Sequence, residues 1–136
     1  MDHPRILVVD DCAESCEPLA KLFIAAGHSA RCVYRGEAAL AFLATHVPDV
    51  ILLDVMMPGM DGVEVLRAIR SDPRTATVPV IVCSAVSDPA FIRSVRARGA
   101  NDYWVKTAIT PVDMLVRLQP YLGTRETGSV VLPAIK

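Results

Sequence analysis

The stretch PDVILLDVMMPGMDG, residues 48–62, decides how this chain is expected to fold. Its apolar run at residues 50–53 is too short for a helix and is typical of a strand buried on both faces. Asp54 interrupts that run, and a carboxylate among aliphatic neighbours is unfavourable unless it is paired or coordinated. The stretch therefore predicts a central buried strand with a functional carboxylate at its end.

Four more strand candidates lie on either side of this stretch. Residues 6–9 and 80–83 are similar runs of Val, Ile and Leu, and residues 30–33 and 103–105 are weaker candidates. Helical patterns fill the gaps between them. Alternation of strands and helices with short connections predicts an α/β fold, in which right-handed crossovers join five parallel strands and helices cover both faces.

The first helical pattern repeats apolar side chains at helical spacing before Gly27, a residue type that commonly ends helices: Cys12, Cys16, Leu19, Phe23 and Ala26. Pro18 falls inside this pattern. Proline removes a backbone donor, which destabilises a regular helix interior by ~3 kcal/mol. We therefore predict a kink in the first helix.

The remaining helices are marked by apolar pairs or by capping residues. The second and third contain Leu40 with Leu43 and Leu66 with Ile69, and have Gly36 and Gly62 near their starts. Two pairs of an N-cap residue and a first-turn proline open the fourth and the fifth, Asp88-Pro89 and Thr110-Pro111. Gly99 is expected to close the fourth helix.

Composition limits the kind of protein this is. The 136 residues are 52% hydrophobic, enough for one core and too few for two ordinary domains. Fourteen Lys and Arg offset fifteen Asp and Glu, so direct binding to nucleic acid is not expected. The apolar runs are far shorter than the roughly 20 residues of a membrane span, and the start MDHPRIL does not look like a signal peptide.

The four cysteines, at positions 12, 16, 32 and 83, form no C-x-x-C pair. We interpret them as reduced thiols of a cytoplasmic protein. Cys12 and Cys16 are one helical turn apart, which suits either a redox pair or two small core-facing side chains, and we favour the second interpretation. The three scattered histidines do not predict a metal site.

Polar residues follow four of the five predicted strands: Asp10 with Asp11, Asp54, Ser84 and Lys106. Each alone has an ordinary explanation as a helix cap, a turn residue or a solvated lysine. Ligands of an open parallel sheet, however, bind outside the carboxyl ends of its strands. Three carboxylates within about 4 Å of one another would repel by ~4 kcal/mol per pair at an effective dielectric near 20. A divalent cation would offset this repulsion, and Mg²⁺ suits oxygen ligands best.

Several of these segments, in this order, resemble the response regulator receivers across residues 5–122. The similarity lies in ILVVDD, in PDVILLDVMMPGMDG, in Ser84-Ala85, and in Asn101-Asp102-Tyr103 leading to Lys106. It implies a flavodoxin-like three-layer sandwich with strand order 2-1-3-4-5 and a receiver domain over residues 1–122. We expect residues 123–136 to be a flexible tail, with docking on a partner as the alternative.

The resemblance also implies a role for each site residue. Asp54 would accept a phosphoryl group from the phosphohistidine of a sensor kinase or phosphotransfer protein. Asp10, Asp11, Asp54 and the backbone carbonyl of Met56 would hold Mg²⁺, and Lys106 would pair with the phosphoryl group. The domain would act as a switch, not as an enzyme that turns over an external substrate.

Two further residues would carry the switch in this family. Ser84 would move to hydrogen-bond a phosphoryl oxygen, and Tyr103 would change rotamer toward the vacated space. Without the resemblance, Tyr103 reads as a half-buried aromatic of an edge strand. The fourth helix, fifth strand and fifth helix would present the signal to a protein target that the sequence does not identify. With no output domain in the sequence, we expect a stand-alone regulator, which either acts by direct contact with its target or relays the phosphoryl group onward.

One departure from the family pattern is Thr107, where receivers usually have proline after the lysine. A cis bond before a non-proline residue costs ~2.5–4 kcal/mol, so we predict a trans Lys106-Thr107 bond with the lysine still reaching Asp54. The departure leaves open a degenerate receiver that binds partners without being phosphorylated. Two other classes fit poorly: aspartate-nucleophile phosphatases need a second aspartate where Met56 stands, and flavodoxin-like cofactor binders need a neutral loop after the first strand.

Overall fold

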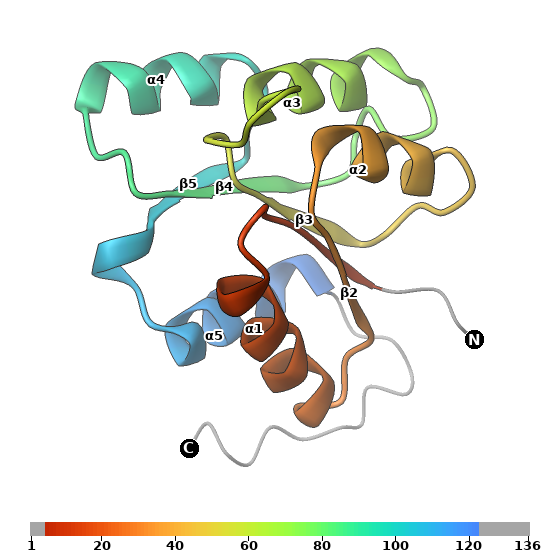
Figure 1. Cartoon of the computed structure of the whole chain (residues 1–136), viewed down its shortest axis with the longest axis vertical. Coiled ribbons are helices and arrows are strands. Elements are labelled where there is room, and N and C mark those ends of the chain that lie inside the picture. Colours follow the sequence, from red (N-terminus) through yellow and green to blue (C-terminus); the bar gives the residue numbers. More distant parts are fainter. Residues whose placement is uncertain (1–4, 123–136) are drawn as a thin grey trace.

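The computed structural model describes residues 5–122, and the predicted tail, residues 123–136, lies outside this range. Five parallel strands form one sheet in the order β2-β1-β3-β4-β5, as predicted (Figure 1). The strands are β1 (Ile6–Val9), β2 (Ala30–Val33), β3 (Val50–Leu53), β4 (Val80–Ser84) and β5 (Asp102–Val105). The helices are α1 (Ala13–Ala25), α2 (Gly36–Leu43), α3 (Gly62–Ser71), α4 (Pro89–Ala97) and α5 (Pro111–Leu122), with a short 3-10 turn η1 (Lys106–Ala108).

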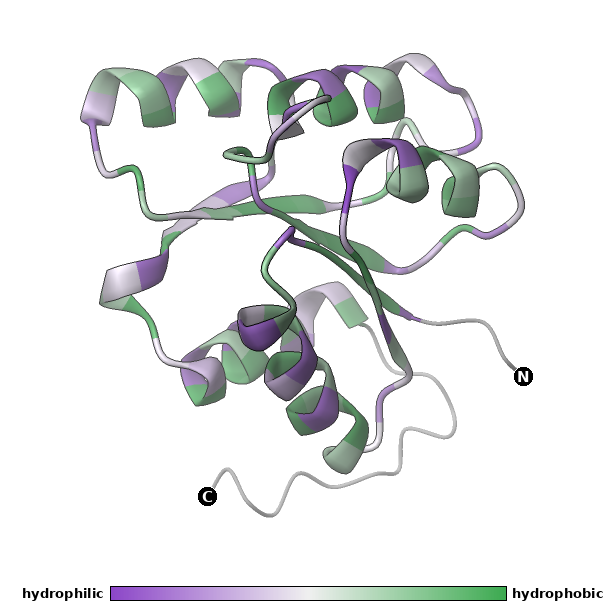
Figure 2. Cartoon of the chain, in the orientation of Figure 1, coloured by the Kyte–Doolittle hydropathy of each residue, from purple (hydrophilic) through white to green (hydrophobic). Residues whose placement is uncertain are grey.

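The helices cover the sheet in two layers, with α2, α3 and α4 on one face and α1 and α5 on the other (Figure 1). Alternate residues of each strand point to opposite faces, so the central strands contribute to two separate cores. Figure 2 shows these strands as the most hydrophobic part of the chain. Leu66 and Ile69 pack in the first core, and Phe23 and Leu118 pack in the second.

The predicted helix ends match the observed ones. Gly27 and Gly99 adopt φ values of 99° and 114°, conformations that L side chains rarely adopt. The Asp88 carboxylate accepts a hydrogen bond from a backbone N–H in the first turn of α4. Thr110 and Asp113 satisfy each other's backbone N–H groups at the start of α5, at 3.1 and 3.2 Å. Local capping chemistry therefore sets where these helices begin and end.

The prediction that both Cys12 and Cys16 face the core is wrong for Cys12. Cys16 is buried, but Cys12 is exposed and is the N-cap residue of α1. The reason is that β1 ends at Val9, so residues 10–12 form the connection above the sheet edge and the helix begins only afterwards. Pro18 lies within α1, which is one element from Ala13 to Ala25, and the kink remains a prediction.

Within residues 5–122, no helix combines the length and the apolar character that crossing a membrane would require.

Candidate functional site

The sheet register brings the predicted site residues to one edge. Val9 of β1 pairs with Leu53 of β3, so Asp10 and Asp54 leave adjacent strands at the same level. Ser84 closes the neighbouring strand β4, and Lys106 follows β5. The carboxyl ends of four parallel strands thus bring the four side chains to one edge of the sheet, as the sequence predicted.

Three carboxylates cluster at this edge of the sheet. Asp10, Asp11 and Asp54 each offer an oxygen atom within 4.8 Å of the others. Asp10 and Asp54 are buried, with 6% and 7% of their surface exposed, and Asp11 is exposed. The backbone N–H of Cys12 donates to Asp10 Oδ1 at 2.9 Å, and that of Met56 donates to Asp54 Oδ1 at 3.0 Å. Each buried carboxylate is therefore held through one oxygen by its own loop.

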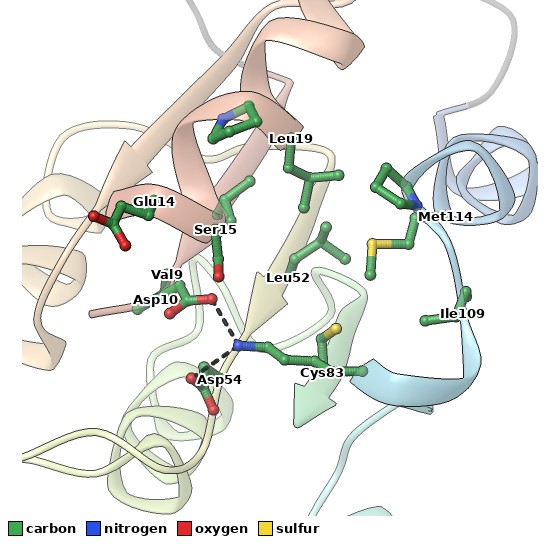
Figure 3. Close-up of a pocket in the computed structure, with 14 residues that line it drawn as sticks. Val9, Asp10, Glu14, Ser15, Leu19, Leu52, Asp54, Cys83, Ile109 and Met114 are labelled. Atoms are coloured by element: carbon green, nitrogen blue, oxygen red, sulfur yellow. Dashed lines mark hydrogen bonds and ion pairs between the residues drawn. The ribbon is translucent and has the colours of Figure 1, made fainter. Parts of the chain in front are cut away.

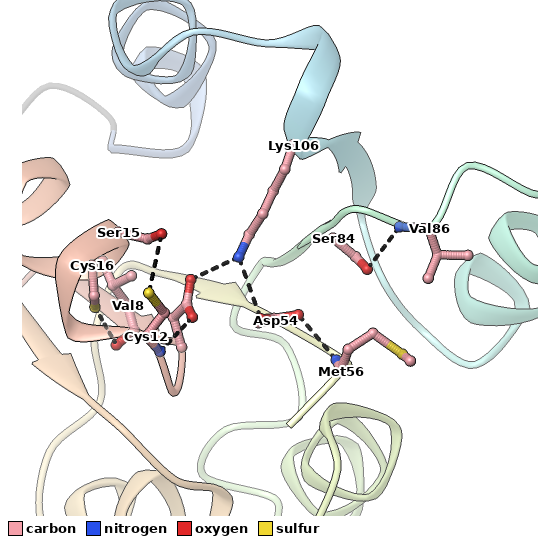
Figure 4. Close-up of polar contacts among 10 residues, drawn as sticks. Val8, Cys12, Ser15, Cys16, Asp54, Met56, Ser84, Val86 and Lys106 are labelled. Carbon is pink, nitrogen blue, oxygen red and sulfur yellow. Dashed lines mark hydrogen bonds and ion pairs between the residues drawn. The ribbon is translucent and has the colours of Figure 1, made fainter. Parts of the chain in front are cut away.

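Lys106 contacts the second oxygen of both buried carboxylates (Figures 3 and 4). Its Nζ atom lies 2.9 Å from Asp10 Oδ2 and 3.3 Å from Asp54 Oδ2. The part of the chain that the structure describes has no cis peptide bond, so the Lys106-Thr107 bond is trans, as predicted. The η1 turn directs the chain away while the lysine side chain reaches back to the sheet edge.

The ionisation of the site follows from this arrangement. Burial raises the pKa of Asp54 above its ordinary value, opposed by the Met56 N–H and by the charge of Lys106. Burial alone would lower the pKa of Lys106, but its contacts with Asp10 and Asp54 outweigh burial and raise that pKa. Lys106 therefore stays protonated and supplies a fixed positive charge between two carboxylates.

Ser84 and Tyr103 meet at Val86, in the loop between β4 and α4 (Figure 4 shows the Ser84 contact). The Val86 N–H donates to Ser84 Oγ at 3.2 Å, and Tyr103 Oη donates to the Val86 carbonyl at 2.7 Å. Ser84 is fully buried, and Tyr103, 7% exposed, packs edge-on against Phe91 of α4. Tyr103 is thus more buried than an ordinary edge-strand aromatic. Both side chains are hydrogen-bonded to the same loop.

The donor set fits a hard divalent cation. Three carboxylates supply only oxygen ligands, and an oxygen set of this kind suits Mg²⁺ better than a softer metal. The Met56 side chain is 59% exposed and points away from the acidic cluster in Figure 4, so only its main chain is available to the site. Its carbonyl as a fourth protein ligand remains a prediction.

Sequence reasoning did not find two features of the site. The first is the Cys12 N–H that orients Asp10, because backbone donors leave no signal in residue types. The second is a cavity of about 390 Å³ between α1, α5 and the sheet edge (Figure 3). Asp10, Asp54 and Lys106 line one end of it, and the rest of its wall is mostly apolar. Such a cavity depends on how two helices pack, which no local motif reports.

Comparison with known proteins gives a consistent result. The family model described as the response regulator receiver domain matches residues 6–119. The chain is 38% identical over 109 residues to the response regulator PleD of Caulobacter vibrioides. This match covers 80% of this chain and 23% of that protein. The chain is 34% identical over 118 residues to the DNA-binding response regulator MtrA of Mycobacterium tuberculosis, covering 87% of this chain and 50% of that protein. The chain therefore spans half or less of these relatives.

Solved structures of similar chains share the fold. The receiver domain of the Francisella response regulator 1452 superimposes with a TM-score of 0.80 at 27% identity, covering 88% of this chain and 97% of that one. The chemotaxis response regulator CheY4 of Vibrio cholerae superimposes with a TM-score of 0.80 at 28% identity, covering 88% and 98%. Both likenesses extend over nearly the whole of the other chain.

Proposed function

The chain belongs to the response regulator receiver family, and from this premise we propose that it is a phosphorylation-operated switch whose acceptor is Asp54. The observation that carries the proposal is the Lys106 ammonium, which lies between the buried carboxylates of Asp10 and Asp54 at hydrogen-bonding distance. A carboxylate that is buried, held by a backbone donor and paired with a lysine is a positioned nucleophile at the end of an apolar strand.

The chemistry that we propose is a phosphoryl transfer between two nucleophiles. A carboxylate oxygen of Asp54 attacks the phosphorus of a phosphohistidine on the donor protein and forms an acyl phosphate. The phosphorus–nitrogen bond breaks, and its electron pair returns to the imidazole ring. The Met56 N–H holds one oxygen of Asp54 in place, and Lys106 balances negative charge on the transferred group.

The same residues would hold the metal ion. We propose that Asp10, Asp11 and Asp54, with the Met56 carbonyl, bind Mg²⁺, which when bound neutralises charge on the phosphoryl oxygens. Before phosphorylation, these residues already place three carboxylates within reach of one cation. Lys106 compensates only part of that negative charge.

The contacts at Val86 support a switching role for Ser84 and Tyr103. We propose that the Ser84 hydroxyl leaves the Val86 N–H and bonds a phosphoryl oxygen, drawing the loop toward the site. Tyr103 donates a hydrogen bond to the Val86 carbonyl and packs against Phe91, so a shift of the loop changes the position of its ring. The change then reaches the face made by α4, β5 and α5.

That face already has a connection between its elements. Arg96 of α4 donates to Asp102 Oδ1 at 2.8 Å, and the Trp104 indole N–H donates to Asp102 Oδ2 at 3.0 Å. A displacement of α4 therefore acts on β5 through a charged pair. We propose that a downstream protein target reads this face, and that a histidine kinase or phosphotransfer protein supplies the phosphoryl group.

The alternative, a degenerate receiver that binds partners constitutively, rests on Thr107 in place of proline. A degenerate site would gain support if the trans bond turned Lys106 toward solvent. Lys106 instead reaches both buried carboxylates. We therefore favour the phosphorylated switch.

A labelling experiment tests the proposal. The protein is incubated with Mg²⁺ and acetyl phosphate, and intact mass is measured. We expect the wild-type protein and Asp72→Asn, a matched change at an exposed aspartate paired with Arg74, to gain one phosphoryl group. Asp54→Asn should gain none, because an amide is not a nucleophile here. Equal labelling of Asp54→Asn would reject the assignment.

A further inference from the structure

A mostly apolar cavity lies between α1 and α5, beside Lys106. We call it the α1–α5 groove. The half-buried Leu19 of α1 lines one side of it. The half-buried Ile109 and the buried Met114 line the side of α5. The groove thus offers apolar side chains from two segments that the packing of the domain does not bring into direct contact everywhere.

The two irregularities of the sequence adjoin this groove. Pro18, which interrupts the pattern of α1, lines the cavity. Ile109, which follows the turn that replaces the usual lysine-proline step, lines it from the other side. The cavity volume of about 390 Å³ falls in the range of ~300–1,000 Å³ typical of ligand sites. The site thus has room for a few apolar side chains.

We propose that residues 130–135, Val-Val-Leu-Pro-Ala-Ile, dock in the α1–α5 groove. They are an apolar sequence that follows the polar stretch 123–129. Their side chains match the apolar wall of the groove. Pro133 favours an extended conformation for the residue before it, which suits a narrow groove between two helices.

The reach of the chain supports this occupant. Arg5 donates a hydrogen bond to the Leu122 carbonyl, so the segment departs from a fixed point at the end of α5. The twelve residues of α5 are ~18 Å long, and seven extended residues, 123–129, span up to ~23 Å. Residues 130–135 can therefore run back along α5 to the cavity at its start.

Charge and tethering favour the same placement. Lys136 follows the apolar residues and would come near Glu14, which lines the cavity rim. A short tether keeps a docking segment at an effective concentration on the order of millimolar, so a weak contact is enough for binding. An apolar segment of the same chain thus has an advantage over any free ligand.

Site-specific photo-crosslinking of the full chain tests the docking. A benzophenone-bearing phenylalanine analogue replaces Leu132, and the crosslinked peptide is identified by mass spectrometry. We expect a product of monomer mass, joined to residues 13–25 or 109–114. Crosslinks elsewhere in the domain, or products of dimer mass only, would overturn the proposal, the second because a neighbouring copy would then be the occupant.

Matched variants locate the contact. Leu19→Ser and Ile109→Ser, one on each side of the groove, should each reduce the monomeric crosslink several-fold. Ile24→Ser, at a 54% exposed position on another side of α1, should leave it unchanged. Equal crosslinking in all three variants would overturn the proposal. Because none of these readouts requires phosphorylation, a negative result would leave the Asp54 assignment intact, and the reverse also holds.

Discussion

Lys106 contacts carboxylate oxygens that a bound metal ion would also contact. Its ammonium contacts Asp10 Oδ2 and Asp54 Oδ2, two oxygens of the acidic cluster. The side chain is 29% exposed, so water screens these contacts only in part. Lys106 therefore offsets repulsion between the carboxylates in the metal-free protein. When Mg²⁺ is bound, the ion should offset part of this repulsion in place of the lysine.

We predict that Lys106→Ala lowers the unfolding free energy in metal-free buffer by ~1.5–3 kcal/mol, the range for hydrogen bonds to charged groups. Millimolar Mg²⁺ should raise the melting temperature of the wild-type protein and should raise that of Lys106→Ala by more, because folding alone gathers the carboxylates. Thermal unfolding with and without Mg²⁺ measures both effects. Identical Mg²⁺ shifts in the two proteins would contradict this charge balance.

The sequence did not predict that His28 is buried. It is 8% exposed, and among the described residues neither ring nitrogen finds a hydrogen-bond partner. Burial, and secondarily the charge of Arg5, lower its pKa from the ordinary value of 6.5. The unfolded chain therefore takes up a proton at a higher pH than the folded protein does. As far as His28 is concerned, the unfolding free energy has its full value above pH 6.5. It decreases as the pH falls from 6.5 toward the lowered pKa of His28 in the folded protein.

We predict that His28→Leu removes this pH dependence. It should also raise the unfolding free energy near pH 7 by up to ~1–3 kcal/mol, the penalty of a buried unsatisfied polar group. His28→Gln, the matched control, should lose the pH dependence without the gain in stability. Urea unfolding between pH 7 and pH 5 measures both. A wild-type stability that is flat over this range would contradict the prediction.

At the level of single residues, the sequence predicted where the polar side chains of the site lie better than it predicted their surroundings. Asp10, Asp54 and Lys106 were identifiable because polar side chains at strand ends meet at one edge of a parallel sheet. Cys12 was placed wrongly and the burial of His28 was not predicted, because exposure at a helix start and burial of a single polar side chain depend on packing between distant segments.

At the level of elements, the loop between β4 and α4 is the part that two of the site residues hold. Ser84 and Tyr103 hold it from two sides through Val86, and Asp88 begins α4 just beyond. Few other contacts hold residues 85–88, most of which are exposed. A loop fixed by two hydrogen bonds can be redirected by a change in either one.

We predict that Tyr103→Phe loosens this loop, because it removes the hydrogen bond to the Val86 carbonyl while keeping the ring. The unfolding free energy should fall by ~0.5–1.5 kcal/mol. Amide hydrogen exchange of residues 85–88 should become faster, whereas exchange in β1 should be unchanged. Tyr121→Phe, which alters a tyrosine of α5, serves as the control. Equal exchange at residues 85–88 in both variants would show that the tyrosine hydroxyl does not hold the loop.

The elements themselves were largely predictable. Short Val, Ile and Leu runs gave the three central strands, because strands buried on both faces need apolar residues at every position. Glycine and N-cap residues located the helix ends to within a residue or so. β4 and β5 are each one residue longer than predicted, since Ser84 and Asp102 join the ladder through backbone pairing that their side chains do not reveal.

At the level of the whole molecule, one sheet separates two cores that must form together. Leu66 of α3 lies in one and Leu118 of α5 lies in the other, and both are fully buried. The strands contribute alternate residues to each core, so losing one layer exposes a face of the sheet that supports the other. The site at the strand ends depends on both layers, because Asp54 and Lys106 come from different strands.

We predict that Leu66→Ala and Leu118→Ala each lower the unfolding free energy by ~2–5 kcal/mol, from lost burial and the cavity that remains. Each variant should still unfold in one cooperative transition, since the cores share the sheet. Val116→Ala, at a 44% exposed position, should change stability little. Two separate transitions by circular dichroism and fluorescence of Trp104 would contradict the shared-core account.

The most direct test of the central claim locates the phosphoryl group on the chain. After reaction with Mg²⁺ and acetyl phosphate, borohydride reduces an aspartyl phosphate to homoserine, and peptide mass spectrometry identifies the modified position. We predict homoserine at position 54 and none at positions 10 and 11, because Asp54 is the buried carboxylate that both the Met56 N–H and Lys106 hold. Homoserine at position 10 or 11, or no homoserine in protein that binds Mg²⁺, would contradict the account.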